Sequence, residues 1–442
     1  MKSAKRSATT RRTTDLPIVA HAKGVPVLAV FSCINLILSL LFFLAVSYKF
    51  IFLLFPLFQK PKSFEKARAK RYAIVIPARN EEGVIGHLLD SIREQDYPKE
   101  CLDAYVIADN CTDSTAETAE RHGAKVYRRT DKHLVGKGYA LDSFFHWLKS
   151  EQSLHTYEGF FIIDADNLLS TDYVSCMNDA FCSGYDIVTS RRNSKNFGSG
   201  WVASANSLWF LWESTFLNSV RCQLGTCCAV SGTGFLFSAE IIEENGGWPY
   251  HLLTEDIEFT VCERMKGKQI GYCAKAEFFD EQPVSFAQSF RQRTRWAKGI
   301  LQIFFRYGLA MIRRIPSSDW FSFLDLSLTV FGTTLLSVVM SAVSLASGIY
   351  QLAVLGHVET GMLFLSTIFT YLIFASAAAY VVSFEWKSIH ASRKAKILSV
   401  FTFPIFMFSY LPIALYAFFT KVEWKPICHG ECKSLSQVTG GR

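Results

Sequence analysis

The sequence predicts an α/β domain that is built on a mostly parallel sheet and inserted between membrane-spanning helices. Residues 65–283 alternate short β-type runs with helical stretches, a pattern typical of a parallel sheet covered on both faces. Apolar segments lie on either side of this region, and each is at least as long as the roughly 20 residues needed to span a bilayer. These two observations define the predicted fold class.

The composition agrees with a chain that is only partly water-soluble. Of the 442 residues, 50% are hydrophobic and 38 are Phe, and the mean hydropathy is +0.18. The formal net charge of +7 is modest, and the basic residues cluster beside the apolar segments. This distribution favours an anionic membrane surface as a partner and argues against nucleic acid.

The 12 cysteines are scattered, and no pair of Cys-x-x-Cys motifs indicates a zinc site. We therefore expect reduced thiols in the cytosol rather than a disulfide scaffold. Residues 428–432 (Cys-His-Gly-Glu-Cys) are of metal-ligating types, although so short a cluster is more often incidental.

The N-terminal region predicts a tail followed by a membrane segment. Residues 1–24 are basic and rich in Ser and Thr, which is typical of a disordered tail. Residues 25–58 are almost wholly apolar apart from Lys49 and predict one span with an interfacial extension, or a tight pair of spans. Both flanks of this segment are basic, so the positive-inside rule does not decide between the two alternatives.

Within residues 65–283, four apolar runs predict strands: 73–76, 104–108, 124–127 and 159–163. We expect helices from about 82 to 95 and after the capping residues 113–115.

The C-terminal part is again amphipathic and then apolar. Residues 284–315 mix aromatic and aliphatic side chains with arginines and predict amphipathic helices at the membrane interface. Three spans are expected within residues 323–420, near 323–351, 362–384 and 397–420. Pro404 and Pro412 fall in the last of them and are tolerated inside a helical bundle. Residues 421–442 form the predicted C-terminal tail.

Polar residues follow three of the predicted strands. Arg79 and Glu81 follow the first, Asp109 ends the second, and Asp164 and Asp166 follow the fourth. Each alone is compatible with a strand-to-helix turn or a helix cap. Ligands bind at the carboxyl ends of strands in such sheets, so we expect these residues to share one crevice. Several carboxylates in one crevice need a cation.

The spacing Asp164-x-Asp166 allows one or both carboxylates to face a hard divalent ion. Magnesium keeps several waters and takes one or two carboxylates together with substrate phosphates. The alternative is a solvated turn.

Two later motifs extend the candidate site. Glu255 and Asp256 precede a helix expected from Ile257, and either they cap that helix or Asp256 is a general base within reach of a hydroxyl group. Residues 292–296 read Gln-Arg-Thr-Arg-Trp. Arginine can hold a phosphate bidentately and tryptophan offers a flat face to a ring, whereas the alternative is anchoring at the membrane interface.

In this order, the strand-end Asp, Lys137-Gly138, Asp-x-Asp, Thr-Glu-Asp and Gln-x-x-Arg-Trp resemble the motifs of membrane-bound family-2 glycosyltransferases. That family includes synthases of cellulose, hyaluronan, chitin and poly-N-acetylglucosamine. The resemblance covers about residues 72–300 and implies a GT-A-type (Rossmann-like) domain. It also implies an inverting transfer from a UDP-sugar, glucose or N-acetylglucosamine, with Mg²⁺ or Mn²⁺. The protein would be a multi-pass protein of the cell membrane with a cytosolic catalytic domain.

The resemblance implies a role for individual positions. Asp256 would be the catalytic base, assisted by Glu255, and Asp166 and Asp164 would hold the metal. The nucleotide sugar would contact Ala78, Arg79, Glu81, Asp109, Lys137, Asp164, Gln292, Arg295 and Trp296. The acceptor would contact Ser231, Gly232, Thr233 and Trp296.

The product stays open at this point. The leading hypothesis is a synthase that elongates a β-linked polysaccharide and translocates it, with accessory export or regulatory subunits as conceivable partners. The alternative is a non-processive transferase that uses a membrane lipid, such as diacylglycerol or a polyprenyl carrier. After Trp296 the sequence has no gating-loop motif of the Phe-x-Val-Thr-x-Lys type, which weakens the case for processive extrusion. A nucleotidyltransferase would have less need of Asp256 and Trp296, and a non-catalytic scaffold would have less need of the carboxylates.

Overall fold

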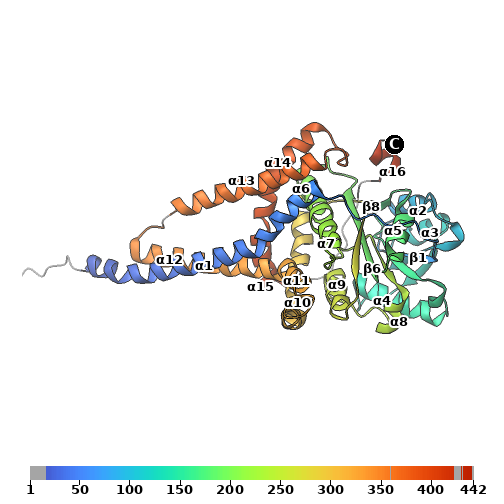
Figure 1. Cartoon of the computed structure of the whole chain (residues 1–442), viewed down its shortest axis with the longest axis horizontal. Coiled ribbons are helices and arrows are strands. Elements are labelled where there is room, and N and C mark those ends of the chain that lie inside the picture. The colour runs from blue at the N-terminus through green and yellow to red at the C-terminus, as the bar shows by residue number, and fades with distance from the viewer. Residues whose placement is uncertain (1–15, 359, 423–429, 431, 441–442) are drawn as a thin grey trace, which may run out of the picture.

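The computed structural model describes residues 16–358, 360–422, 430 and 432–440. An α/β domain lies at one end of the elongated molecule, and long helices project from it (Figure 1). Helix α1 (Leu16–Phe58) begins within the range 1–24 for which we expect a basic tail. The rest of that range, residues 1–15, lies outside the described residues, as does most of the Cys-rich cluster at 428–432.

One eight-stranded sheet forms the centre of the α/β domain, in the order β3-β2-β1-β4-β7-β6-β8-β5. The strands are β1 (Tyr72–Ala78), β2 (Leu102–Asp109), β3 (Lys125–Arg129), β4 (Gly159–Ile162), β5 (Leu168–Leu169), β6 (Ile187–Ser194), β7 (Phe235–Ser238) and β8 (Ile270–Asp280). The pairs β1–β2, β2–β3, β1–β4 and β6–β8 are parallel. The predicted α/β fold is confirmed, and the four strands expected from the sequence are β1 to β4.

Strand β7 makes the sheet mixed rather than wholly parallel. It runs antiparallel to both β4 and β6, with Phe235 opposite Ile162, and β5 runs antiparallel to β8. Because β7 starts where β4 ends, the loop before it, residues 231–234, reaches the carboxyl end of β4. The reversed strand therefore brings a distant loop to the Asp164 region.

Helices cover both faces of the sheet. One apolar cluster packs the sheet against α4 (Lys137–Ser150), α8 (Ala239–Asn245) and α9 (Glu255–Met265). The other packs it against α2 (Ile85–Arg93), α3 (Thr115–Arg121) and α5 (Tyr173–Cys182). Short 3₁₀ turns, η1 (Lys99–Cys101) and η2 (Leu154–Thr156), precede β2 and β4. The loops at the carboxyl ends of the strands are thereby left for the site.

A second helical layer separates this domain from the long helices. It contains α6 (Trp201–Trp212), the π-helical turn η3 (Glu213–Asn218) and α7 (Ser219–Gln223). It also contains α10 (Phe286–Arg314), a single 29-residue helix over the range for which amphipathic helices are predicted. One face of α10 buries Arg293, Gly299 and Ile303, and another exposes Phe305 and Leu309.

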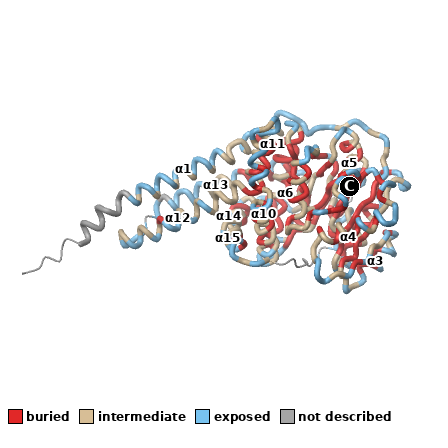
Figure 2. The backbone as a smooth tube through the Cα atoms, turned by 90° about the horizontal axis from the view of Figure 1, so that it is seen from below, coloured by how far each residue is buried: buried red, intermediate tan, exposed pale blue. Residues whose placement is uncertain are grey.

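Four helical segments are long and apolar enough to cross a membrane: Val27–Phe58, Trp320–Leu355, Leu363–Phe384 and Arg393–Phe419. The first segment belongs to α1, and the third is formed by α13 (Gly361–Phe384). The second consists of α11 (Trp320–Ser327), the π-helical turn η4 (Leu328–Gly332) and α12 (Thr333–Leu355). The fourth consists of α14 (Arg393–Phe408) and α15 (Tyr410–Phe419). A short helix, α16 (Leu435–Thr439), lies at the end of the described chain. Figure 2 shows the described residues of the projecting helices as mostly exposed or intermediate, whereas buried residues are concentrated in the interior of the α/β domain and the helices next to it. The surfaces of the projecting helices are apolar, which is what contact with lipid requires.

The last of these segments is broken at Ser409, between α14 and α15. Pro412 has no backbone N–H, and its ring conflicts with the carbonyl group four residues earlier, so the helix does not continue smoothly across Phe408. Arg293 of α10 binds at this break: its Nη1 donates to the Ser409 hydroxyl at 2.7 Å and to the Phe406 carbonyl at 3.3 Å. These two hydrogen bonds link helix α10 to the junction between α14 and α15.

A buried ion pair joins the two regions elsewhere. Arg221 of α7 and Asp325 of α11 form two hydrogen bonds of 2.6 and 3.0 Å, and each side chain is only 2% exposed. The Tyr48 hydroxyl of α1 donates to the same carboxylate at 2.6 Å. One carboxylate therefore holds α1, α7 and α11 together.

We expect Asp325→Ala to destabilise the protein by about 3–5 kcal/mol, because it leaves a buried arginine without its counter-ion. Thermal and denaturant unfolding in detergent, followed by tryptophan fluorescence, would measure this loss. Glu120→Ala is the control, since it removes an exposed partner of Arg128 and should unfold almost like the parent protein. Equal stability of the two variants would contradict the prediction.

Candidate active site

A single cleft opens at the carboxyl ends of β1, β2 and β4. It is lined by Pro77, Ala78, Arg79, Glu81, Asp109, Lys137, Ala140, Asp164, Ala165, Asp166, Gly232, Leu253, Thr254, Glu255, Asp256, Arg295 and Trp296. The structure therefore brings together both candidate catalytic residues, both candidate metal ligands and every candidate donor-binding residue except Gln292. These residues come from segments that are far apart in the chain.

Lys137, the first residue of α4, joins three of these segments. Its Nζ donates to Asp164 Oδ1 and to the Gly232 carbonyl, both at 2.6 Å, and lies 4.0 Å from Glu255 Oε1. Burial disfavours the charged form of Lys137, but the carboxylates of Asp164 and Glu255 outweigh this effect and raise its pKa. The ammonium group thus stays charged at the centre of the acidic cleft.

Two glycines set the distance between the segments that form the site. A Cβ atom on Gly138 would lie 2.1 Å from the Tyr250 carbonyl oxygen, and one on Gly299 would lie 2.4 Å from Thr254 Oγ1. The start of α4 therefore packs directly against the backbone at Tyr250, shortly before the Thr-Glu-Asp motif. The middle of α10 packs directly against Thr254, the first residue of that motif. The first of these contacts explains why glycine follows Lys137.

Glu255 and Asp256 form the first turn of α9, close to Lys137. Burial, and then the charge of Asp256, raise the pKa of Glu255 to about 7. Burial also raises the pKa of Asp256, opposed by the backbone N–H of Ile257 and by Lys137. Two neighbouring carboxyl groups whose pKa values are both raised are suited to accept a proton.

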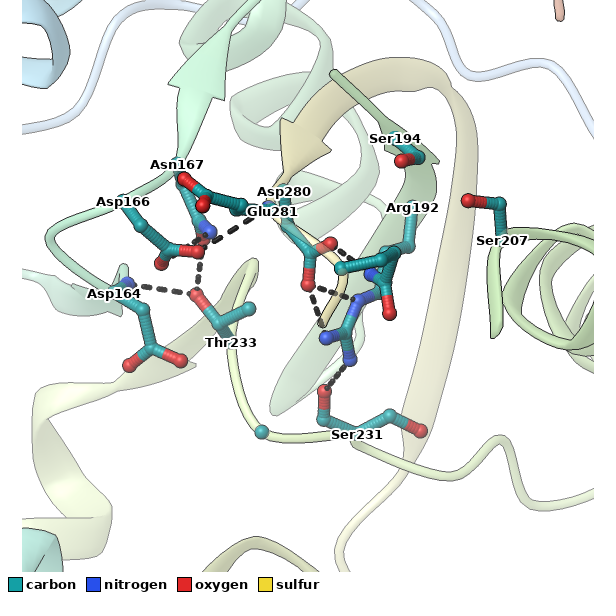
Figure 3. Close-up of polar contacts among 12 residues, drawn as sticks. Asp164, Asp166, Asn167, Arg192, Ser194, Ser207, Ser231, Thr233, Asp280 and Glu281 are labelled. Carbon is teal, nitrogen blue, oxygen red and sulfur yellow. Dashed lines mark hydrogen bonds and ion pairs between the residues drawn. The ribbon is translucent and has the colours of Figure 1, made fainter. Parts of the chain in front are cut away.

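The Asp164-x-Asp166 segment is held in place by neighbouring loops (Figure 3). The Asp164 backbone N–H donates to Thr233 Oγ1 at 2.8 Å, and that hydroxyl donates to Asn167 Oδ1 at 2.6 Å. Asp166 accepts from the Glu281 backbone N–H at 3.2 Å. The Asp164 carboxylate is 37% exposed and faces the cleft, where it pairs with Lys137.

The carboxylates of Asp164 and Asp166 fit a divalent cation whose other ligands are phosphate oxygens and water. No group of three or more His, Cys, Asp or Glu side chains in the described part of the chain is placed to hold a metal ion by itself. Two adjacent carboxylates are the number that Mg²⁺ takes when phosphates and water complete its shell. Burial, together with the charges of Asp166 and Asp164, also raises the pKa of Asp280 to about 7. The three carboxyl groups thus concentrate negative charge, which a bound cation would offset.

The ends of β1 and β2 form the other wall. Asn80 and Asn110 have φ values of 59° and 53°, which turn the chain sharply after each strand. The Asp109 carboxylate at the end of β2 pairs with Arg129 at 2.6 Å, and both side chains are less than a tenth exposed. Burial raises the pKa of Asp109 despite this arginine.

Three of the predicted site residues do not line the cleft. Ser231 and Thr233 lie behind it, where the Ser231 hydroxyl donates to Glu213 at 2.8 Å and the Thr233 hydroxyl is used by the Asp164 segment. Gln292 is half-buried on α10, and its Oε1 is buried with no hydrogen-bond partner among the residues that the structure describes. Of the candidate acceptor residues, Gly232 and Trp296 line the cleft.

The structure adds residues that sequence analysis missed. Arg192 of β6 donates to Asp280 Oδ2 at 2.8 Å and to the Ser231 carbonyl at 2.9 Å (Figure 3). Asp280 ends β8, so the rule that singled out Asp109 and Asp164 at strand ends also applies to it. Arg192 and Glu213 lie in segments without a recognisable motif, and no sequence signal marks them.

The mixed sheet and the acidic cleft at its strand ends define a glycosyltransferase domain of the GT-A type. The chain belongs to the glycosyltransferase-like family 2, whose sequence profile matches residues 69–299.

Similar proteins agree with this assignment. The probable glycosyltransferase YdaM of Bacillus subtilis is 24% identical over 380 residues, which cover 78% of this chain and 85% of that protein. The beta-monoglucosyldiacylglycerol synthase of a Nostoc species is 25% identical over 291 residues, which cover 62% of this chain and 59% of that protein. Among solved structures, a mannosyltransferase from Pyrobaculum calidifontis in complex with GDP-mannose and Mn²⁺ has a TM-score of 0.56 at 18% identity, covering 87% of this chain and 98% of that one. This last likeness shows the fold.

We expect Gly138→Ala to abolish most of the activity while leaving the protein folded, because the added methyl group must displace Lys137 or the 250-region backbone. Ligand-stabilised thermal unfolding with UDP and an activity assay would separate the two effects. Gly361→Ala is the matched control, since a Cβ atom there has no neighbour within 4 Å. Full activity of Gly138→Ala would show that this close approach is not needed.

Proposed function

We propose that the protein is an inverting transferase that moves a hexose, glucose or N-acetylglucosamine, from a UDP-sugar to a hydroxyl group. One observation carries the proposal: Asp256, Asp164 and Trp296 open onto the same cleft although they lie in different elements. A base and a stabilised leaving group on one cleft suffice for a single displacement, which inverts the sugar carbon.

In this proposal the side chains divide between donor and acceptor. Ala78, Arg79, Glu81 and Asp109 surround the nucleotide, whereas Lys137 and Arg295 face the diphosphate. Asp256 accepts the proton of the attacking hydroxyl while the new bond from that oxygen to the sugar forms. The bond between the sugar and the phosphate oxygen breaks, and UDP leaves. Trp296 presents its ring to a sugar, and Gly232 leaves space beside Asp256.

We also propose that Asp164 and Asp166 hold Mg²⁺ or Mn²⁺ together with the donor phosphates. When bound, such a cation neutralises the charge that develops on the diphosphate leaving group. Lys137 and Arg295 supply fixed positive charge at the same place.

For the product, we favour a glycolipid that is made on a membrane lipid. In support, a relative is named as a beta-monoglucosyldiacylglycerol synthase, and α10 connects the cleft to the apolar helices through Arg293. The second candidate is a β-linked polysaccharide, which is favoured by the Gln-x-x-Arg-Trp motif on α10. In both cases the four apolar helices would cross the membrane. The catalytic domain would face the cytosol, in agreement with the free thiols of all described cysteines.

The proposal is tested by incubating the full chain in nanodiscs with UDP-glucose or UDP-N-acetylglucosamine and Mg²⁺ or Mn²⁺. UDP release and mass spectrometry of the product would be recorded. We expect Asp256→Asn to lower transfer by at least about 100-fold, because a general base contributes about that much, with UDP binding unchanged. Undiminished transfer by this variant would remove Asp256 from its role, and a polymeric product would decide for the second candidate.

The pH dependence gives a separate prediction. Below about pH 7, the pKa of Glu255, Glu255 takes up a proton. This removes a negative charge beside Asp256 and makes Asp256 a weaker base, so activity should fall as the pH drops through this value. Glu255→Gln removes the group that takes up this proton, so the acid limb of the kcat profile should move away from pH 7, to lower pH. An unchanged acid limb in this variant would show that another group controls the profile.

A further inference from the structure

Gly430 and residues 432–440, here named the C-terminal strap, lie against the α/β domain and have no role in the reaction proposed above. Val438 of α16 packs on Leu168 and Phe279, which are paired residues of β5 and β8. Figure 1 shows α16 next to β8. Because β5 is the last strand of the sheet, the strap covers an edge that would otherwise be open.

Covering this edge needs only α16, but the strap also reaches the loop that holds Asp166. The Gly430 backbone N–H donates to Glu281 Oε1 at 2.8 Å. The Glu281 backbone N–H in turn donates to Asp166 Oδ2 at 3.2 Å (Figure 3). Glu281 Oε2 pairs with Lys195 Nζ at 3.1 Å, and both side chains are less than a tenth exposed. Glu281 is thus held from two sides, and it binds a proposed metal ligand.

The strap touches the opposite wall of the cleft as well. A Cβ atom on Gly83 would lie 3.5 Å from Cys432 Sγ, which is ordinary van der Waals contact. Gly83 lies in the loop after β1, two residues beyond Glu81, which lines the cleft. Because Gly430 and Cys432 are two positions apart, at most about 7 Å of chain separates the contact with Glu281 from the contact with Gly83. The strap therefore joins the loop after β8 to the loop after β1.

These contacts lie on both sides of Asp166. Leu168, two residues later in the chain, is covered by α16, and the carboxylate of Asp166 is bound by the residue that Gly430 holds. Hydrogen-bond partners that orient a metal-ligating carboxylate typically change metal affinity by about 10–100-fold when they are altered. Detachment of the strap would release Glu281 on one side and expose Leu168 on the other, so Asp166 would lose restraints on its position.

We propose that the C-terminal strap is a positioning element, which holds Asp166 and the loop after β1 in the arrangement that binds the cation together with UDP. It acts through Glu281 and Leu168, since none of its described residues lines the cleft. This inference rests on the proposed function, because it requires Asp166 to bind the cation.

An engineered disulfide tests where the strap lies. Cysteines whose Cβ atoms are about 3.5–4.5 Å apart can form a disulfide, and the Cys432 sulfur is already 3.5 Å from a Cβ atom at position 83. Gly83 does not have a positive φ value, so a cysteine fits its backbone. We expect Gly83→Cys, in the full chain in nanodiscs, to bond to Cys432 when oxidised with copper phenanthroline. Peptide mass spectrometry would detect this bond.

Gly83→Cys combined with Cys432→Ser is the control for this experiment and should give no bond between the two positions. If the single variant also gave none, the placement of the strap would be wrong and the inference would fall.

Val438→Asp tests what the strap does. A charge at this buried position opposes packing on Leu168 and Phe279, so α16 should detach and the disulfide yield in the Gly83→Cys background should drop. We expect the dissociation constant of Mn²⁺ in the presence of UDP to rise at least about tenfold, with the acceptor KM unchanged. Electron paramagnetic resonance of free Mn²⁺ would measure this constant without the transfer reaction. Ser436→Asp adds the same charge on the exposed face of α16 and should bind Mn²⁺ like the parent protein.

The outcomes separate this inference from the proposal on which it rests. If Val438→Asp detached the strap but bound Mn²⁺ and UDP as tightly as the parent protein, the positioning role would be refuted and the transferase assignment would stand. If the parent protein bound neither UDP nor Mn²⁺ and transferred no sugar, the proposed function would fail, and this inference with it.

Discussion

The ammonium group of Lys137 is the interaction on which the rest of the site depends. It holds the Asp164 carboxylate and the Gly232 carbonyl at hydrogen-bond distance and lies beside Glu255. These partners belong to the end of β4, the loop before β7 and the start of α9. Without this cation, the carboxylates of Asp164 and Glu255 would repel one another in a cleft that screens charge less well than bulk water does. The position of Lys137 depends in turn on Gly138, the residue that allows α4 to approach Tyr250 so closely.

The strand ends could be predicted because local sequence determines them. Asp109 and Asp164 directly follow apolar runs, and parallel strands direct their carboxyl ends to one edge, so their convergence needs no tertiary information. The strand 235–238 was not predicted, because a four-residue apolar run is too short to distinguish from a buried turn. Its direction depends on pairing with β4 and β6, and this pairing brings loop 231–234 to the cleft.

The remaining residues of the site were beyond sequence analysis for a related reason. Arg192 and Asp280 are 88 positions apart and meet because β6 and β8 pair with a register shift after Ser190. Glu213 reaches Ser231 from a π-helical turn, which sequence patterns do not indicate. Conversely, Thr233 resembles an acceptor contact by its place in the motif, but its hydroxyl is used within the protein by Asp164 and Asn167. Roles assigned by motif position stay predictions until such contacts are known.

The contact between Gly299 and Thr254 has a mechanical consequence. Helix α10 carries exposed apolar side chains on one face and touches the start of the Thr-Glu-Asp motif with another, at a distance that leaves no slack. A tilt of α10 toward α9 would therefore push on Thr254, two residues before Asp256. In the proposed membrane-bound state, the thickness and lateral pressure of the bilayer would thus act on the geometry of the Thr-Glu-Asp segment.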